Sequence, residues 1–571
     1  MLAVLPAAAQ DRFEVKAETG VRTAMRDGVV LISDVYRPAA ERTFPVLLQR
    51  TPYDRKGAGG QARQLAAHGY VVVVQDTRGR YDSQGEFYPF RHETEDGYDT
   101  VEWAAKLAGS NGRVGMYGGS YVGATQMLAA LGRPPRLEAI FPYVTASEYY
   151  DGWTYQSGVL MQWFTSSWAS GLAMDTVRRK VAAGRRLRDW IWQTPVERFP
   201  LLELPRAEGL APYFRDWVEH ETDDAYWKRW KISDHYGELA VKGLHGAGWH
   251  DIFLKGSIRN YLGLRESQSA AVRDGQRLLI GPWAHATTSE EGKIGDVVFG
   301  RQAVLDMTGT IRAWFDYALK GVRNEYATGA PVRIFVMGEN VWRDEREYPP
   351  ARARLTRYYL HSTQGANSVQ GDGSLSTVPP QGERPDVFDY DPWNPAPTIG
   401  GRLCCANDVF PPGPFDQRPN EQRPDVLVYS TSPLEKDLEV TGEIAVELYA
   451  ATTAIDTDYT AMLVDVDPSG YARLLTDGIV RARYRNSTER SEPVVPGQVY
   501  RYRIDLWSTS NLFRAGHRIR LYVSSSNFPR FHRNPNTGER TSGATGMVKA
   551  RQTIYHDSKR ASALLLPVVP R

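Results

Sequence analysis

Ser120, Asp251 and His285 are residues of the three types that form a nucleophilic triad, and they occur along the chain in that order. Ser120 lies in the segment 113–126, RVGMYGGSYVGATQ, where an apolar run is followed by glycines and then by helix-forming residues. This pattern predicts a strand, a sharp turn and a helix, with the serine raised at the turn. The first N–H groups of the helix would then lie beside its hydroxyl and stabilise an oxyanion.

The turn departs from the usual G-x-S-x-G pattern, because Val122 is the second residue after Ser120 and Gly123 comes one position later. A glycine-rich phosphate loop or an ordinary tight turn is therefore the alternative interpretation. A dinucleotide site requires G-x-G-x-x-G and a P-loop ends in Gly-Lys-Ser/Thr. The segment contains neither, so the acid and the histidine must decide between the interpretations.

Asp251 and His285 each follow an expected strand, at 241–245 and 277–281. The order of nucleophile, acid and base is that of the α/β-hydrolases. His285 would take the proton of Ser120 during attack and pass it to the leaving group, while Asp251 would fix the imidazole tautomer. The alternative is that the aspartate caps its loop and the histidine is a hydrogen-bonded turn residue.

The sequence predicts no cofactor and no metal. His245, His250 and Asp251 also suggest a metal site, but their neighbours are apolar and no further ligand cluster appears. Cys404 and Cys405, the two cysteines of the chain, are adjacent. This excludes a disulfide framework and a cysteine zinc site, and it leaves either a vicinal disulfide or two packed thiols.

The composition of the 571 residues is that of a globular protein with two or three domains. A formal net charge of +2 predicts no nucleic-acid partner, and the basic run at 178–188 is interpreted as a solvated helix face. No stretch of about 18 apolar residues predicts a membrane span. The expected partner is a small-molecule ester or acyl substrate, and a homo-oligomer is left open.

The N-terminal segment 1–10, MLAVLPAAAQ, is apolar, then small, and turns polar from Asp11. It resembles the end of a secretory signal peptide with an alanine-rich cleavage site, although the basic n-region is missing. Residues 1–10 are therefore interpreted as a remnant signal peptide. A secreted or periplasmic protein and a cytoplasmic one both stay open.

Changes in the hydrophobic pattern divide the chain. Strands and helices alternate over residues 11–146 and again over 241–330, which predicts one α/β domain built from two pieces. The tryptophan-rich helical sequence at 147–240 is expected to be a cap inserted into that domain. Short alternating strands over 331–571 predict an all-β sandwich of the jelly-roll type.

Several motifs resemble the CocE/NonD hydrolase family, which is related to the X-Pro dipeptidyl-peptidases. They are GGSYVG at 118–123, GWHDIFL at 248–254, GPWAH at 281–285, TPY at 51–53, DPWNPAPT at 391–398 and GHRIRL at 516–521. The resemblance covers nearly the whole chain from about Val15. It implies an α/β-hydrolase domain, a helical cap and a C-terminal jelly roll.

The resemblance also implies roles for residues outside the triad. The hydroxyl of Tyr53 would join the backbone N–H of Tyr121 in the oxyanion hole. Trp153, Trp168 and Phe253 look like the residues that hold an acyl ring in an esterase of the family. Core packing is the alternative for both tryptophans.

The predicted function is that of a serine hydrolase which cleaves carboxylic esters through an acyl-enzyme, and cleavage of amides is left open. Relatives that hydrolyse α-amino esters carry acidic residues after the triad aspartate, whereas IFLK stands at 252–255 here, which disfavours an amino ester. An X-Pro dipeptidyl-peptidase is the alternative enzyme, although such peptidases have extra N-terminal helical sequence. A carbohydrate-binding protein with an inactive hydrolase half is the alternative from another class.

Overall fold

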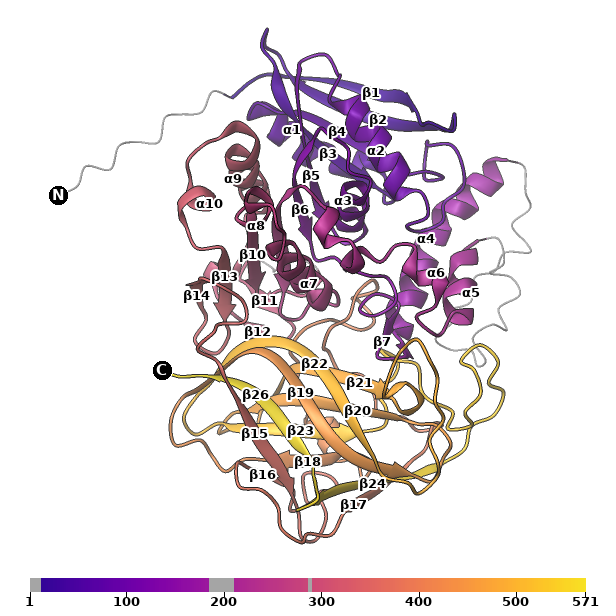
Figure 1. Ribbon diagram of the computed structural model, residues 1–571, viewed down its shortest axis with the longest axis vertical. Helices are drawn as coiled ribbons and strands as arrows, with labels where there is room; N and C mark the ends of the chain where they lie inside the picture. Colours follow the sequence, from indigo (N-terminus) through magenta and orange to yellow (C-terminus); the bar gives the residue numbers. More distant parts are fainter. Residues whose placement is uncertain (1–11, 184–209, 286–289) are drawn as a thin grey trace, which may run out of the picture.

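The computed structural model describes residues 12–183, 210–285 and 290–571. An α/β part fills the upper half of Figure 1, a β part fills the lower half, and helices of the cap lie beside both. The predicted signal remnant at 1–10 and the cap residues 184–209, with part of the basic run, lie outside the described residues.

A ten-stranded sheet forms the centre of the α/β part. From β4 to β13 all neighbouring strands are parallel, whereas β1, β2 and β14 pair in antiparallel fashion. Across the sheet the strands are β1 (Val15–Ala24), β2 (Val30–Pro38), β4 (Val71–Asp76), β3 (Phe44–Thr51), β5 (Ser110–Gly119), β6 (Leu137–Tyr143), β9 (Lys242–Gly248), β10 (Gln276–Gly281), β13 (Val332–Val336) and β14 (Val341–Glu345). The central strands are buried on both faces, which explains continuous apolar runs such as that of β4.

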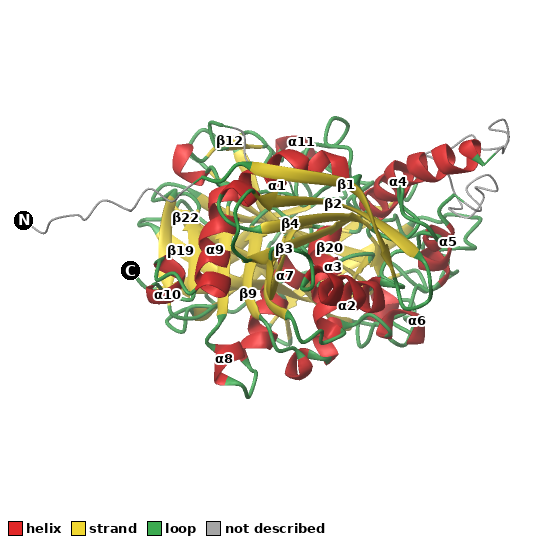
Figure 2. Ribbon diagram, turned by 90° about the horizontal axis from the view of Figure 1, so that it is seen from above, coloured by secondary structure: helices red, strands yellow, loops and turns green. Residues whose placement is uncertain are grey.

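Helices cover both faces of this sheet (Figure 2). Side chains of α1 (Gly59–Ala67) and α9 (Met307–Lys320) share one apolar cluster, and those of α2 (Glu93–Ala104) and α3 (Tyr121–Leu131) share another. Further helices of this part are α7 (Leu254–Arg265), α8 (Ala270–Arg273) and α10 (Glu325–Thr328), and a small hairpin is formed by β11 (Lys293–Ile294) and β12 (Val297–Val298). The predicted α/β class is confirmed.

The cap leaves the sheet after β6 and returns to it at β9. Its described elements are β7 (Tyr155–Gln156), β8 (Val159–Leu160), α4 (Gln162–Ala182), α5 (Pro212–Glu219) and α6 (Ala225–Lys228). Buried tryptophans and tyrosines from these elements join the apolar cluster of α2 and α3. None of the helices among the described residues is long and apolar enough to cross a membrane.

The C-terminal part is built from strands that enclose one apolar core. They are β15 (Arg354–His361), β16 (Ser374–Ser376), β17 (Asp386–Tyr390), β18 (Leu427–Ser430), β19 (Leu438–Thr452), β20 (Asp458–Val466), β21 (Ala472–Arg481), β22 (Tyr500–Phe513), β23 (Arg518–Ser524), β24 (Ala550–Asp557), β25 (Arg560–Ala561) and β26 (Ala563–Val569), with the short helix α11 (Arg418–Glu421) in a long connection. The all-β prediction is confirmed, and the finer jelly-roll assignment stays a prediction.

The predicted boundary between residues 330 and 331 is wrong for two strands. β13 pairs in parallel with β10 and β14 pairs with β13, so both extend the α/β sheet instead of opening the β part. The expected alternation at 332–336 is not observed, because Arg333 is exposed and the other four residues of β13 are buried. Burial of this kind is typical of a strand inside a sheet that is covered on both faces. A strand-like sequence does not identify its partner, because pairing depends on residues far away in the chain.

Cys404 and Cys405 are joined as a vicinal disulfide, which was one of the two alternatives. Cys404 is buried and belongs to the apolar cluster that also contains the cap tryptophans. The segment that connects β17 to β18 therefore packs against the α/β part and its cap.

A buried histidine of the β part gives a test of its packing. The Nδ1 of His556 lies 3.1 Å from Glu383 and its Nε2 lies 3.0 Å from Asp386. Burial opposes the charged imidazole, but Asp386 and Glu383 outweigh burial and raise the pKa of His556. The resulting stabilisation is fully present below the ordinary histidine pKa of about 6.5 and is lost as the pH rises through the raised value.

We expect His556→Gln to lower the unfolding temperature more at pH 6 than at pH 9, since the variant cannot supply the charge that is present at the lower pH. Thermal unfolding followed by circular dichroism measures this difference. His68→Gln is the control, because the His68 ring contacts a backbone carbonyl, that of Gln64. An equal loss at both pH values would contradict a charged His556.

Candidate active site

Ser120 stands at a sharp turn between β5 and α3. Its backbone has φ 61° and ψ −129°, a conformation that costs energy for a residue with a side chain. Gly118 has φ 129°, and a Cβ on Gly123 would lie 2.7 Å from the Cβ of Thr145. Gly118, where a Cβ would lie 2.4 Å from the side chain of Val122, permits the close approach of β5 and α3, as the pattern predicts. Gly123 permits α3 to approach the segment that follows β6.

The loops that carry Asp251 and His285 leave adjacent parallel strands at the same level. Gly248 at the end of β9 is paired with Gly281 at the end of β10. The N–H of His250 donates to the carbonyl of Trp283 at 2.9 Å, which ties the two loops together. A Cβ on Gly248 would lie 2.2 Å from that carbonyl oxygen, so this contact requires glycine.

The structure brings the three predicted triad residues together. The Nε2 of His285 lies 2.9 Å from the Oγ of Ser120, although 165 positions separate them in the chain. Its Nδ1 lies 2.7 Å from the Oδ2 of Asp251, which is buried, and the N–H of Phe253 donates to the other carboxylate oxygen at 2.7 Å. A proton can therefore pass from serine to imidazole while the carboxylate holds the ring.

Tyr53 lies at the same place. Its hydroxyl accepts a hydrogen bond from the Nε1 of Trp168 at 2.9 Å. Burial raises the pKa of Tyr53, although Trp168 and the side chain of Ser120 act in the opposite direction, so the hydroxyl keeps its proton at neutral pH. Tyr53 is 41% exposed, so solvent reaches this side of the Ser120 turn.

Arg55, which the sequence analysis did not single out, anchors the loop of Tyr53. Its guanidinium lies 3.0 Å from Asp34, 2.5 Å from Asp76 and 2.7 Å from Asp82. Between Tyr53 and this anchor, Asp54 has φ 77°. Buried ion pairs of this kind join β2, β4 and the loop, so no local sequence pattern could have identified them.

Tyr121 is held from behind by a second buried pair. Its hydroxyl donates to Glu93 at 2.9 Å and accepts from the N–H of Phe90 at 2.9 Å. Glu93 in turn lies 2.6 Å from the guanidinium of Arg50. Tyr121 is the first residue of α3 and directly follows Ser120. Its backbone N–H has no acceptor within the helix, because the first N–H groups of a helix lack an internal partner.

The three aromatic residues predicted for the acyl pocket form a cluster that reaches the imidazole. Trp153 and Phe253 stack with ring centroids 4.2 Å apart, and Phe253 meets His285 edge to face at 5.1 Å. Trp153 and Phe253 have 0% exposure, whereas Trp168 is 4% exposed. Because their stacked faces close on each other, Trp153 and Phe253 form a packed layer next to Trp168. This burial agrees with the core-packing alternative for Trp153, and the role of the three residues in holding an acyl group stays a prediction.

The two other histidines near the acid are buried and uncharged. His245 bonds Gln276 at 2.9 Å, and burial lowers the pKa of His245 to about 4 and that of His250 to about 3. Among the described residues no group of three or more His, Cys, Asp or Glu side chains could hold a metal ion.

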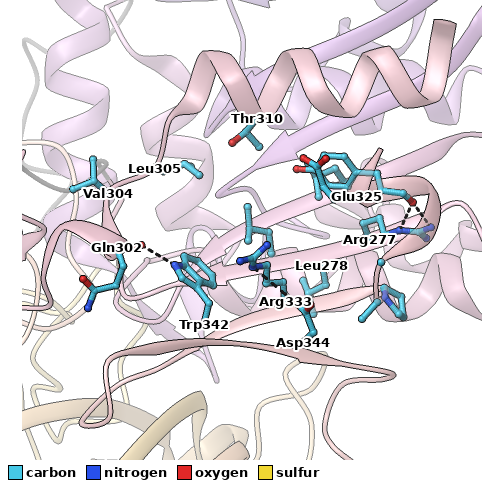
Figure 3. Close-up of a pocket in the computed structure, with 16 residues that line it drawn as sticks. Arg277, Leu278, Gln302, Val304, Leu305, Thr310, Glu325, Arg333, Trp342 and Asp344 are labelled. Atoms are coloured by element: carbon cyan, nitrogen blue, oxygen red, sulfur yellow. Dashed lines mark hydrogen bonds and ion pairs between the residues drawn. The ribbon is translucent and has the colours of Figure 1, made fainter. Parts of the chain in front are cut away.

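A pocket of about 260 Å³ lies elsewhere in the α/β part, between α9 and the strands β10, β13 and β14 (Figure 3). The Nε1 of Trp342 donates there to the carbonyl of Gln302, and the guanidinium of Arg277 donates to that of Tyr326. Neither Tyr53 nor a predicted triad residue lines this pocket. The candidate site is therefore the one around Ser120.

Comparisons with known proteins agree with this arrangement. Residues 27–287 match the profile of the X-Pro dipeptidyl-peptidase (S15 family), and residues 324–565 match that of the X-Pro dipeptidyl-peptidase C-terminal non-catalytic domain. The first match contains Ser120, Asp251 and His285. The second covers the all-β part.

Individual relatives cover nearly the whole chain. Cocaine esterase of Rhodococcus sp. is 37% identical over 97% of this chain and 98% of its own. The crystal structure of an aminopeptidase from a marine sediment archaeon (Thaumarchaeota) has a TM-score of 0.81 at 25% identity, covering 100% of this chain and 98% of its own. An α-amino acid ester hydrolase has a TM-score of 0.79 at 25% identity, covering 99% and 98%. The chain therefore belongs to the CocE/NonD family of serine hydrolases, to which its sequence motifs pointed.

Proposed function

We propose that the protein hydrolyses carboxylic esters with uncharged acyl groups and that Ser120 is its nucleophile. The observation that carries this proposal is the unbroken hydrogen-bonded chain from Asp251 through His285 to Ser120. The similarity to cocaine esterase of Rhodococcus sp. supports an ester substrate.

In the proposed mechanism His285 removes the proton of the Ser120 hydroxyl as its oxygen attacks the ester carbonyl. The imidazolium, stabilised by Asp251, then gives that proton to the departing alkoxide, so that an alcohol leaves and an acyl-enzyme remains. A water molecule attacks the acyl carbon with the same imidazole as its base. The carboxylic acid leaves and the serine recovers its proton.

The hydroxyl of Tyr53 and the backbone N–H of Tyr121 are proposed to stabilise the oxyanion of both tetrahedral intermediates. Both donors are held in place beside Ser120. Arg55 anchors the loop that carries Tyr53, and Glu93 accepts a hydrogen bond from the hydroxyl of Tyr121 at the start of α3. Donors that are fixed in advance need no reorganisation as charge develops.

An apolar acyl group fits the surroundings of the triad. Trp168 is buried, with 4% exposure, and its Nε1 donates to the Tyr53 hydroxyl beside Ser120. We propose that Trp168 contacts the acyl group with Trp153 and Phe253 behind it. Phe253 and Leu254 follow the acid where an ammonium-binding site would need carboxylates. An X-Pro aminopeptidase is the second candidate, because the S15 profile and the archaeal aminopeptidase structure match the chain.

Replacing the nucleophile tests the proposal. We expect Ser120→Ala to reduce kcat for p-nitrophenyl esters by about 10⁴-fold or more, because a triad acts as a unit. Steady-state release of p-nitrophenol measures it. Ser469→Ala in a turn of the β part is the control and should keep full activity. Near-wild-type turnover by the Ser120 variant would contradict the proposal.

Removal of one oxyanion donor should act on kcat and leave KM nearly unchanged. For Tyr53→Phe we expect a loss of roughly a hundredfold in kcat, since the donor is needed mainly in the transition state. Tyr317→Phe on α9 serves as the matched control. If Tyr53→Phe raised KM alone, the hydroxyl would have a binding role instead.

A substrate panel distinguishes the two candidate functions. Acetyl, butyryl and benzoyl p-nitrophenyl esters are compared with Ala-Pro-p-nitroanilide and with an α-aminoacyl ester. We expect kcat/KM to be highest for an uncharged acyl ester, because no carboxylate stands directly after Asp251 to bind an ammonium group. Preference for Ala-Pro-p-nitroanilide would favour the aminopeptidase instead.

A further inference from the structure

A single ammonium group joins the three parts of the molecule beside the candidate site. The Nζ of Lys255, in the first turn of α7, lies 2.7 Å from the Oδ2 of Asp151 and 2.9 Å from the Oδ2 of Asp505. Asp151 belongs to the cap and Asp505 to β22 of the β part. Lys255 itself comes four residues after Asp251, the proposed catalytic acid.

Each carboxylate is held in its orientation by a backbone N–H group a few residues further along the chain. The other oxygen of Asp151 accepts the N–H of Ser157 at 3.2 Å, and that of Asp505 accepts the N–H of Trp507 at 2.8 Å. One oxygen of each is therefore fixed and the second faces Lys255. This is a built arrangement and not a chance surface pair, since the side chains of Lys255 and Asp151 are only 14% and 16% exposed.

The charges respond as members of a buried ion cluster do. Burial alone would raise the pKa of Asp151, but Lys255 and Arg259 outweigh it and lower the pKa of Asp151 to about 2. Burial likewise opposes the charge of Asp505, and Lys255 lowers the pKa of Asp505 below its ordinary value. All three groups are thus charged at neutral pH. Removal of the ammonium would leave the two carboxylates with the guanidinium of Arg259, which lies 3.7 Å from the Oδ2 of Asp151, as the remaining cation of the cluster.

The ion pair lies in register with the aromatic stack of the site. Asp151 and Trp153 are two residues apart in the cap, and Phe253 and Lys255 are two residues apart after the acid. Asp151 pairs with Lys255 while Trp153 stacks on Phe253. The same two segments are therefore joined twice, and Phe253 meets the imidazole of His285.

We propose that Lys255 is a positioning residue which fixes the layer of Trp153 and Phe253 and thereby sets the selectivity for bulky acyl groups. This inference rests on the proposed function. Lys255 acts through Phe253 and does not touch the reacting atoms. If this layer became mobile, binding of a benzoyl group, which needs the aromatic surface, would weaken more than binding of an acetyl group, which does not need it.

The test compares p-nitrophenyl benzoate with p-nitrophenyl acetate for Lys255→Met and Lys255→Arg. We expect the ratio of kcat/KM for benzoate over acetate to fall on the order of tenfold in K255M, mainly through KM for the benzoate. K255R should stay close to wild type, because a guanidinium can still reach both carboxylates. A purely stabilising role would lower the activity on both esters alike.

Asp505→Asn provides a second, milder variant, which removes only the charge contributed by the β part. Its ratio should shift in the same direction by less, and the double variant K255M/D505N should be no worse than K255M. If K255M folds and its ratio of kcat/KM for benzoate over acetate is unchanged, the inference is overturned. If K255M does not fold, an unchanged ratio in D505N overturns it. A wild-type protein inactive on both esters would instead contradict the proposed function.

Discussion

The site depends on one constraint, namely that parallel strands of a single sheet end at a common edge. β5, β9 and β10 deliver Ser120, Asp251 and His285 to that edge, and the hydrogen-bonded chain between them follows from strand order. Glycine is needed near the ends of β5 and β9, because a Cβ on Gly118 would lie 2.4 Å from the side chain of Val122 and a Cβ on Gly248 would lie 2.2 Å from the Trp283 carbonyl oxygen. Glycine at these positions allows the segments that carry the reacting groups to pack closely.

Polar and apolar contacts around this edge hold different parts of the site. Buried ion pairs hold the backbone on which the oxyanion donors stand, through Arg55 for the loop of Tyr53 and through Arg50 and Glu93 for Tyr121. Aromatic packing covers the imidazole, and the indole N–H of Trp168 links the cap to Tyr53. Apolar rings beside a polar reaction centre lower the local dielectric constant, which strengthens electrostatic stabilisation.

Local patterns were sufficient to predict the elbow, since a strand, a glycine-rich turn and a helix are adjacent in sequence. Chain order then selected Asp251 and His285, which the structure brings to Ser120. The sequence could not place β13, because a strand-like run says nothing about which strand lies beside it. Nor could it identify Arg55 or the closed stack of Trp153 on Phe253, whose partners are distant in the chain and whose burial depends on the assembled domains.

Covalent labelling tests the central claim most directly. The protein is incubated with a fluorophosphonate, which reacts with an activated serine hydroxyl, and the digested peptides are mapped by mass spectrometry. The account predicts a single adduct on Ser120 together with complete loss of ester hydrolysis, and no adduct in His285→Ala. An adduct on another serine, or an active protein that takes no label, would contradict it.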